Sequence, residues 1–410
     1  LNRRQGKEPV VYPSKDLELA LGRTLGVPVF QEQVMQVAIL AAGFTPGEAD
    51  GLRRAMAAWK RKGGLEKYYS KIVDGMTARG YEQSFAESIF EQIKGFSEYG
   101  FPKSHSASFA LLVYASCWIK CHEPAAFLAA LLNSQPLGFY SCSQLVQDAQ
   151  RHGVEVRPVD VMHSDVESTL EDLPQVPAVR LGLHMVRGLR GRSAERIVQE
   201  RRAAPFDSAE DLARRCHLEL HEMKLLAAAD ALQSLAGHRR QQVWEAAALH
   251  AVPELLHEAP VDEDVLELDE ASEGEEVLWD FASLGLTLRS HPMALLRARL
   301  ERYRLRTSEQ LRHAPNGRIV RTAGIVTVRQ QPQTAGGTIF VSLEDEYGSI
   351  QVIVWRSVRE AQREVLLGAR LLAVQGRWQR EGEVCNLIAE KLADLSPLLG
   401  RLATQSRDFR

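Results

Sequence analysis

Three adjacent residues, Lys103, Ser104 and His105, precede an apolar stretch at residues 109–132. A helix that begins here would offer free backbone N–H groups and positive charge, which together form a phosphate-binding site. The apolar stretch predicts that this helix is buried. The alternative is an ordinary capped core helix, because a serine N-cap is common and any lysine can lie beside it.

Arg53 and Arg54 form a second candidate phosphate contact, inside an expected helix at residues 48–62. Adjacent side chains on a helix point about 100° apart, so the two guanidinium groups could bind different oxygens of a triphosphate. Arginine is also better matched to phosphate geometry than lysine is. The alternative interpretation is a pair of ordinary solvated helix charges.

A glycine-containing turn at residues 186–191 is followed by an expected helix at residues 193–202. Such a turn brings the backbone close to a phosphate and exposes N–H groups at the start of the second helix. This helix-hairpin-helix pattern holds a nucleic-acid backbone without reading bases. A second copy at residues 227–241 has Asp230 where the pattern has glycine, so we expect it to be a structural partner. The candidate DNA contacts are Arg187, Gly188, Leu189, Arg190, Gly191 and Arg192.

Residues 316–395 alternate apolar and polar side chains in five expected strands, with one helix after the third. That order is typical of an OB-fold, which binds single strands by stacking bases on aromatic side chains in a basic groove. Strand aromatics are as often core residues as surface residues, so that alternative stays open for each ring. The candidate contacts are Phe340, Trp355, Arg377 and Trp378.

Composition limits the class of protein. The chain has 410 residues, of which 45% are hydrophobic and 25% charged, and no run approaches the length of a membrane span. We therefore expect a soluble, cytoplasmic, multidomain protein without a membrane partner. The five cysteines are scattered and predict neither a zinc site nor a disulfide. The net charge of −3 hides basic clusters that indicate a polyanionic ligand.

Several strings resemble the fingers domain of bacterial C-family DNA polymerases, the DNA polymerase III alpha subunit family. They lie at residues 29–35, 52–56, 100–106 and 118–120. Pro102, residues 237–241, residues 320–330 and the tail at 406–410 resemble the error-prone, translesion branch. The resemblance implies that Arg53, Arg54, Lys103, Ser104 and His105 contact the phosphates of an incoming nucleotide.

The resemblance also implies a cofactor and partners. Polymerisation requires carboxylates on a palm sheet that hold Mg²⁺, and we find no such pair here, since Asp262 and Asp264 belong to an acidic run. The catalytic and metal-binding residues are therefore expected outside this chain, which alone should bind DNA without extending it. The implied partners are primer-template DNA, single-stranded template and deoxynucleoside triphosphates. A further implied partner is an inactive Y-family-like polymerase homologue that recruits the enzyme, with the sliding clamp engaged only indirectly and the complex nucleoid-associated when active.

The fold class predicted from these patterns is multidomain α+β. The expected parts are a mainly helical fingers segment at 1–135, truncated at its start, a connecting helix and strand at 136–175, tandem helix-hairpin-helix motifs at 176–250, an acidic linker at 251–290, a linking helix at 291–315, a five-stranded OB-fold barrel at 316–395 and a tail at 396–410. Two alternatives stay open: a non-catalytic nucleic-acid scaffold that recruits partners, and an RNA-binding module.

Overall fold

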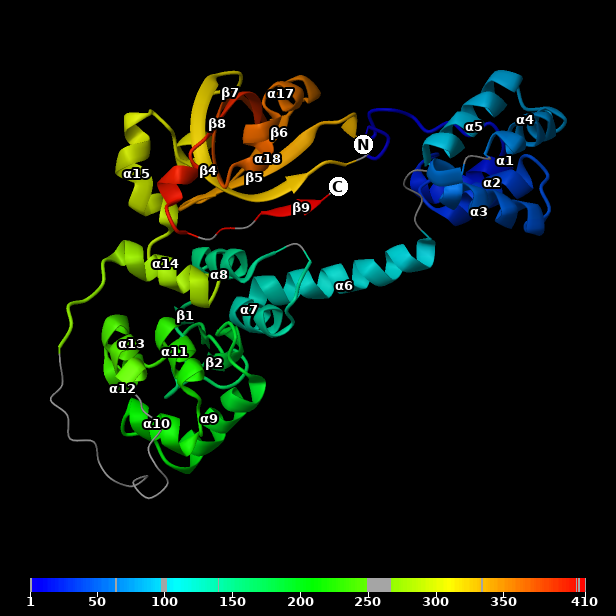
Figure 1. Cartoon of the computed structure of the whole chain (residues 1–410). Coiled ribbons are helices and arrows are strands. Elements are labelled where there is room, and N and C mark those ends of the chain that lie inside the picture. The colour runs from blue at the N-terminus through cyan, green and yellow to red at the C-terminus, as the bar shows by residue number, and fades with distance from the viewer. Residues whose placement is uncertain are drawn as a thin grey trace. The chain divides into compact units, whose positions relative to one another are not determined.

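The computed structural model describes residues 2–62, 65–96, 102–138, 140–248, 267–332, 335–402, 404 and 406–409. The chain forms two compact units, Leu1–Lys120 and Cys121–Arg410. Figure 1 labels the helices and strands along the chain. Each unit contains apolar core residues of its own.

The first unit is helical. Its apolar residues recur at helical spacing, and the resulting faces pack into one core that includes Val34, Leu52 and Ile72. The Ser14 side chain caps the first helix by accepting from the Leu17 N–H at 3.2 Å. The elements are α1 (Lys15–Leu21), η1 (Gly22–Thr24), α2 (Gln31–Leu40), α3 (Pro46–Lys62), η2 (Glu66–Tyr68), α4 (Tyr69–Thr77) and α5 (Gln83–Phe96).

Helix α6 (Lys103–His122) begins at the lysine that the sequence predicts, but the prediction that it is buried is wrong. None of its residues is buried, and Leu111 and Tyr114 are each more than 70% exposed. Its apolar side chains surround the helix instead of forming one stripe, so no single face can pack against a neighbouring core.

The second unit starts with two helices and a small sheet. Helices α7 (Pro124–Asn133) and α8 (Cys142–Arg151) precede strands β1 (Val156–Arg157), β2 (Thr169–Glu171) and β3 (Ala178–Arg180). The strand order is β1-β3-β2, with β1 parallel to β3. One strand was expected near residues 154–159, and β1 occupies two of those positions.

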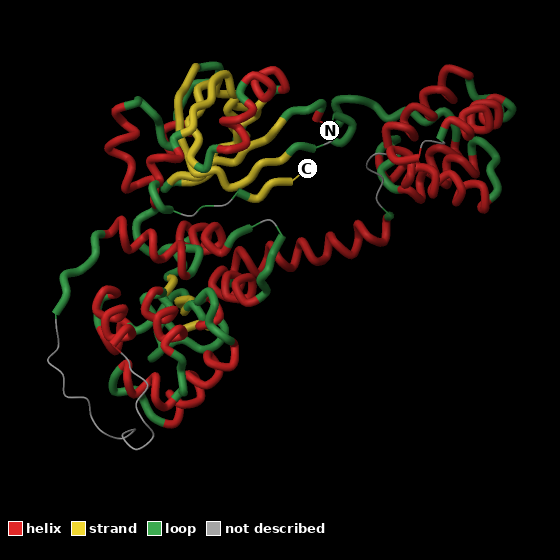
Figure 2. Tube along the Cα trace, viewed as in Figure 1, coloured by secondary structure: helices red, strands yellow, loops and turns green. Residues whose placement is uncertain are grey.

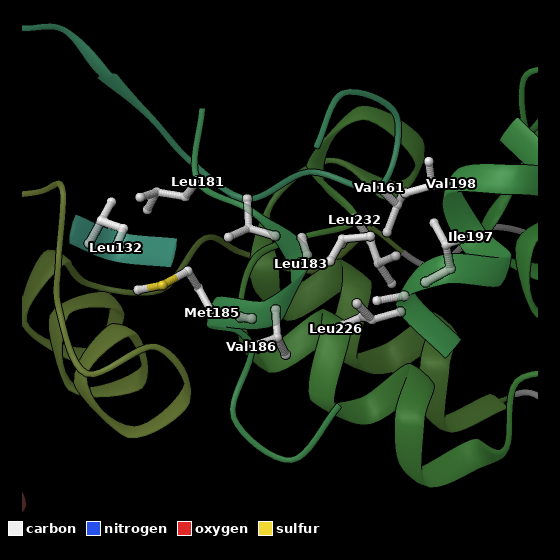
Figure 3. Close-up of a cluster of buried hydrophobic side chains, with 14 of the residues drawn as sticks. Leu132, Val161, Leu181, Leu183, Met185, Val186, Ile197, Val198, Leu226 and Leu232 are labelled. Carbon is white, nitrogen blue, oxygen red and sulfur yellow. The ribbon is translucent and has the colours of Figure 1, made fainter. Parts of the chain in front are cut away.

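The helix-hairpin-helix region packs around a continuous apolar core. Leu183, Ile197, Leu226 and Leu232 come from successive segments of the region and meet in this core (Figure 3). The elements are η3 (Leu183–Met185), α9 (Gly191–Ala203), α10 (Ala209–Arg215), α11 (Leu220–Ala228), α12 (Gln233–Ala236) and α13 (Arg239–Ala248).

The acidic segment at 251–290 is more than a linker. Residues 249–266 lie outside the described residues, but Glu273–Ser283 forms helix α14. Its Val277 and Asp280 are buried, and Asp280 pairs with Arg239 of the preceding region and with Arg289, which follows α14. Helices α15 (Pro292–Arg302) and α16 (Ser308–Arg312) follow.

The last region is a closed barrel, shown in Figure 2 as the group of long yellow strands. Its order β5-β6-β8-β7-β4 closes through pairing of β5 with β4, so the fold class predicted from sequence is confirmed. The tail adds a short parallel strand to β4. The elements are β4 (Ile319–Gln330), β5 (Ile339–Asp345), β6 (Gly348–Val354), α17 (Arg356–Ala361), α18 (Arg363–Gly368), β7 (Leu371–Glu381), β8 (Val384–Asp394), η6 (Ser396–Leu399) and β9 (Arg407–Phe409).

Candidate nucleic-acid interface

The turn between η3 and α9 has the geometry that its glycines predict. Gly188 has φ +85°, a conformation that other residues adopt only with strain, and a Cβ there would lie 3.2 Å from Leu225 Cδ1. Gly191 begins α9, and a Cβ built on it meets nothing within 4 Å. The backbone at this end of the turn is therefore open to a ligand.

The N-terminus of α9 is uncapped. Arg190 occupies the N-cap position and supplies no side-chain cap, and the first turn holds no acidic residue. Its leading N–H groups therefore keep their capacity to bind an anion, reinforced by the dipole of a 13-residue helix.

Arg190 forms an ion pair with Glu219 at 3.0 Å, which raises the pKa of the guanidinium. Both side chains are largely exposed, so the pair is weak. Arg192 is exposed and has no ion pair among the described residues.

Two other predicted contacts in this turn have structural roles. Arg187 Nη1 donates to the carbonyl oxygens of Phe281 and Ala282 at 3.0 and 3.3 Å, at the end of α14. Leu189 is half-buried and packs against the core of the region. Leu189 therefore anchors the turn, and Arg187 joins the turn to α14.

The second turn differs, as the acidic residue there predicts. Asp230 has φ +60°, is buried, and accepts from Gln242 Nε2 at 2.7 Å and Arg289 Nη2 at 2.7 Å. Arg239 lies 3.7 Å away and is fully buried. Because Gln242, Arg239 and Arg289 surround Asp230, this turn offers no open site for a phosphate there, and its role is structural.

In the first unit, the predicted phosphate contacts are held by carboxylates. Arg53 and Arg54 both pair with Asp50, at 2.8 and 3.0 Å, one turn earlier in α3. The Lys103 N–H, at the start of α6, donates to both carboxylate oxygens of Glu32 on α2 at 3.0 Å. A phosphate at either position would have to displace a carboxylate of the chain itself.

Ser104 and His105 are both exposed in the first turn of α6, and the centroid of the His105 ring lies 4.4 Å from that of Phe109. Arg53 and its partner Asp50 both lie on α3, whereas Lys103 contacts Glu32 on α2. The contacts of Arg53 and of Lys103 therefore do not bring the two halves of the predicted nucleotide site together.

The four barrel candidates differ in how far their side chains are exposed. Trp378 is 3% exposed and packs in the barrel core, so the prediction that its ring stacks on a base is wrong. Its neighbour Arg377 points outward and is exposed, because successive strand residues face opposite sides of a sheet. Trp355 is 52% exposed at the end of β6, and Phe340 is partly exposed on β5.

Strand register connects two of these candidates through residues that the sequence did not single out. Phe340 pairs with Ile353, Ile353 with Ile388, and Ile388 with Arg377. Directly paired residues share a face, so these side chains form one outward band across four strands. Alternation within each strand marks them as outward, but only the register shows that they are neighbours.

No group of three or more histidine, cysteine, aspartate or glutamate side chains within the described residues is arranged to hold a metal ion. Asp230, Glu276 and Asp280 do lie together, but Arg239 and Arg289 bind them. These residues therefore do not fit a Mg²⁺ ion. No helix of the described chain combines the length and apolar character needed to cross a bilayer.

Comparison with known proteins agrees with this arrangement. Residues 1–80 match the finger domain of the bacterial DNA polymerase III alpha subunit, residues 153–242 the helix-hairpin-helix motif, and residues 320–395 the OB-fold nucleic acid binding domain. Proteins named error-prone DNA polymerase from Alkalilimnicola ehrlichii and Bordetella parapertussis are 54% and 55% identical over 410 and 417 residues. The alignments include 100% of this chain and 40% of each relative. The chain is homologous throughout to error-prone DNA polymerases.

A third such polymerase, from Azoarcus sp., is 56% identical over 400 residues, covering 96% of this chain and 38% of its own length. The chain thus spans about two fifths of the curated relatives it matches. The resemblance to the C-family polymerases and their error-prone branch is confirmed.

Proposed function

We propose that the chain is the DNA-binding, C-terminal part of an error-prone DNA-directed DNA polymerase that acts in translesion synthesis, DNA repair and damage-induced mutagenesis. The observation that supports it most directly is the uncapped N-terminus of α9, which follows the glycine turn and lies between Arg190 and Arg192. This arrangement suits the phosphate backbone of primer-template DNA and is independent of base sequence.

Binding by the turn is tested with Arg190→Gln combined with Arg192→Gln in the 410-residue chain. The affinity for duplex DNA is measured over a range of salt concentrations. The control combines Arg299→Gln with Arg363→Gln, two exposed arginines that have no ion pair among the described residues. Loss of two duplex phosphate contacts should make the negative slope of log affinity against log salt shallower by about 2. The control should leave the slope unchanged, and an equal effect in both variants would contradict the assignment.

The proposed role of Arg53 and Arg54 is to bind the incoming nucleotide in the full-length polymerase. Asp50 would hold the two side chains until a triphosphate replaced it. In a polymerase of the relatives' length, Arg53→Ala with Arg54→Ala should raise the KM for deoxynucleoside triphosphates. Unchanged nucleotide affinity would instead favour the non-catalytic scaffold.

Catalysis is proposed to require residues outside this chain. Mg²⁺ would be held there, and it would supply the charge stabilisation of phosphoryl transfer. Primer extension with the 410-residue chain, Mg²⁺ and all four nucleotides should give no incorporation above background. Incorporation would refute this part of the proposal.

The proposed partners are single-stranded template and an inactive Y-family-like polymerase homologue, with indirect access to the sliding clamp. The proposed location is cytoplasmic and nucleoid-associated.

Competition between primer-template DNA and tRNA at fixed salt distinguishes the RNA-binding alternative from a DNA-binding function. Preferential displacement by tRNA would favour an RNA module, since purely ionic binding weakens alike for both ligands as salt rises.

A further inference from the structure

Three cations share one outer wall of the barrel, on strands β4, β7 and β8. Arg321 pairs with Gln375 across β4 and β7, and Gln375 pairs with Lys391 across β7 and β8. Arg377 lies two residues along β7 from Gln375, on the same face. Arg321, Arg377 and Lys391 are all exposed, so the wall presents three positive charges to solvent.

No carboxylate neutralises these three cations, in contrast to arginines such as Arg53, Arg239 and Arg297. Arg321 Nε donates to Gln375 Oε1 at 2.9 Å, and Arg377 Nη1 donates to the Gly317 carbonyl at 3.0 Å. Within the described part of the chain, Lys391 has neither a hydrogen bond nor an ion pair from its side chain. Neutral partners leave the full charge available to an anion.

The spacing of the three charges suits an extended anion. Neighbouring strands lie about 4.8 Å apart, so Arg321 and Lys391, which flank β7, are separated by roughly 10 Å at the backbone. Arg377 and Gln375 are about 7 Å apart along the strand. The three positions extend both across and along the wall, so successive phosphates of one strand can each contact one of the cations.

The residues around the wall determine which contacts it can make and where the positive surface ends. The ring next to Arg377 in sequence, Trp378, faces the core, so no aromatic side chain of β7 stacks on a base here. The neighbouring outward residue on β8 is Ile388, which continues the band toward Phe340. The β7–β8 turn carries Glu381 and Glu383, and Glu390 precedes Lys391. The carboxylates of the turn, which lies beyond Arg377 along β7, exclude an anion from that end of the wall.

We infer that this wall is a phosphate track for the single-stranded DNA held by the barrel. The inference rests on the proposed function and adds a division of roles within the OB-fold. Phe340 and Trp355 contact bases, while Arg321, Arg377 and Lys391 contact the backbone of the same strand. Contacts to phosphate alone do not require bases, so the track should also hold an abasic strand.

The test uses the 410-residue chain with Arg321→Gln, Arg377→Gln and Lys391→Gln combined. A control with the same change in charge replaces three other exposed arginines that lack ion pairs among the described residues: Arg299→Gln, Arg363→Gln and Arg401→Gln. Affinity is measured for oligo(dT) and for an abasic oligonucleotide of equal length over a range of salt concentrations.

Loss of three single-strand contacts should make the negative slope of log affinity against log salt shallower by about 2 for both oligonucleotides. The control should leave both slopes unchanged. An unaltered slope in the track variant, or an equal change in the control, would overturn the inference. If the triple variant does not fold, Lys391→Gln alone should make the negative slope shallower by about 0.7. This substitution is suitable because the Lys391 side chain has no partner to lose in the described structure.

Failure of the track and failure of the proposed function give different results. If the unaltered chain binds neither oligonucleotide, both fail. If it binds oligo(dT) and the track variant matches it at every salt concentration, only the track is refuted. Trp355→Ala should weaken binding to oligo(dT) about tenfold and leave the abasic strand unaffected, which separates base contacts from phosphate contacts.

Discussion

Replacement of Arg239 by methionine should destabilise the helix-hairpin-helix region more than any surface substitution nearby. The Arg239 side chain has no exposed area, and its Nη1 atom lies 3.1 Å from Glu276 Oε2. Its Nη2 atom contacts Asp280 and lies 3.7 Å from Asp230 Oδ2. Arg289 pairs with the same three carboxylates. Two arginines thus pair with three carboxylates, and the substitution leaves one arginine to pair with all three.

Removal of one partner from a buried ion network costs about 3–5 kcal/mol, because the remaining charges stay desolvated. Burial already raises the pKa of Glu276, which shows that its environment disfavours a further unpaired charge. Methionine fills a similar apolar volume, so the loss should come from the charge and not from a cavity. For a cooperative unit of about 150–250 residues, such a loss lowers Tm by roughly 10 °C.

Urea unfolding followed by circular dichroism measures this loss. Arg240→Met is the matched control: Arg240 is the next residue, is partly exposed and pairs with Glu275 at the surface, so its loss should be below about 1 kcal/mol. Arg239→Met combined with Glu276→Gln restores the original charge balance and should be less destabilised than Arg239→Met alone. A loss below about 1 kcal/mol for Arg239→Met would refute the reasoning.

The remaining predictions concern titration and thiol reactivity. Glu276 has a folded pKa above its ordinary 4.5, so its stabilising contribution is complete below pH 4.5 and is lost as pH rises through the folded value. Glu276→Gln should flatten the decline in stability over that range, and an unchanged pH profile would contradict this. The Lys71 hydrogen bond lowers the pKa of Glu48 to about 2, and Lys71→Met should move it toward 4.5 in an NMR titration; a value that stays near 2 would exclude the pair as the cause. Burial raises the pKa of Cys216 to about 11, so at about pH 8 iodoacetamide should modify the two exposed cysteines of α6 first and spare Cys216 until the chain unfolds. Early modification of Cys216 would show that its site is open.

Local chemistry was sufficient to predict the first turn and the barrel. Backbone geometry requires a glycine at position 188, where φ is positive, and a sequence shows such a glycine directly. Alternation in residues 316–395 gives strands, and alternation also requires that Arg377 and Trp378 face opposite sides. Both were proposed as DNA contacts, but only one could be exposed, and burial favours the tryptophan in the core.

Long-range contacts account for what the sequence could not predict. The carboxylate of Glu32 binds the Lys103 N–H from 71 residues away, and no local pattern links the two. The acidic run likewise looks uniformly solvated, yet Asp280 is buried because Arg239 approaches from another helix. Composition cannot distinguish an acidic residue that pairs with a distant arginine from one that remains in water.

Two properties of the basic residues, their partners and their grouping on one surface, should decide where this chain binds a polyanion. Arg53, Arg54 and Arg239 all contact carboxylates, so an anion would compete with an existing pair or could not enter. Arg192 and Lys391 have no such partner among the described residues. In the proposed function each binds a phosphate without first losing an internal contact, so its counterion release should appear in full in the salt dependence. The turn at α9 and the β4–β7–β8 wall should therefore dominate that dependence, despite a net charge of −3.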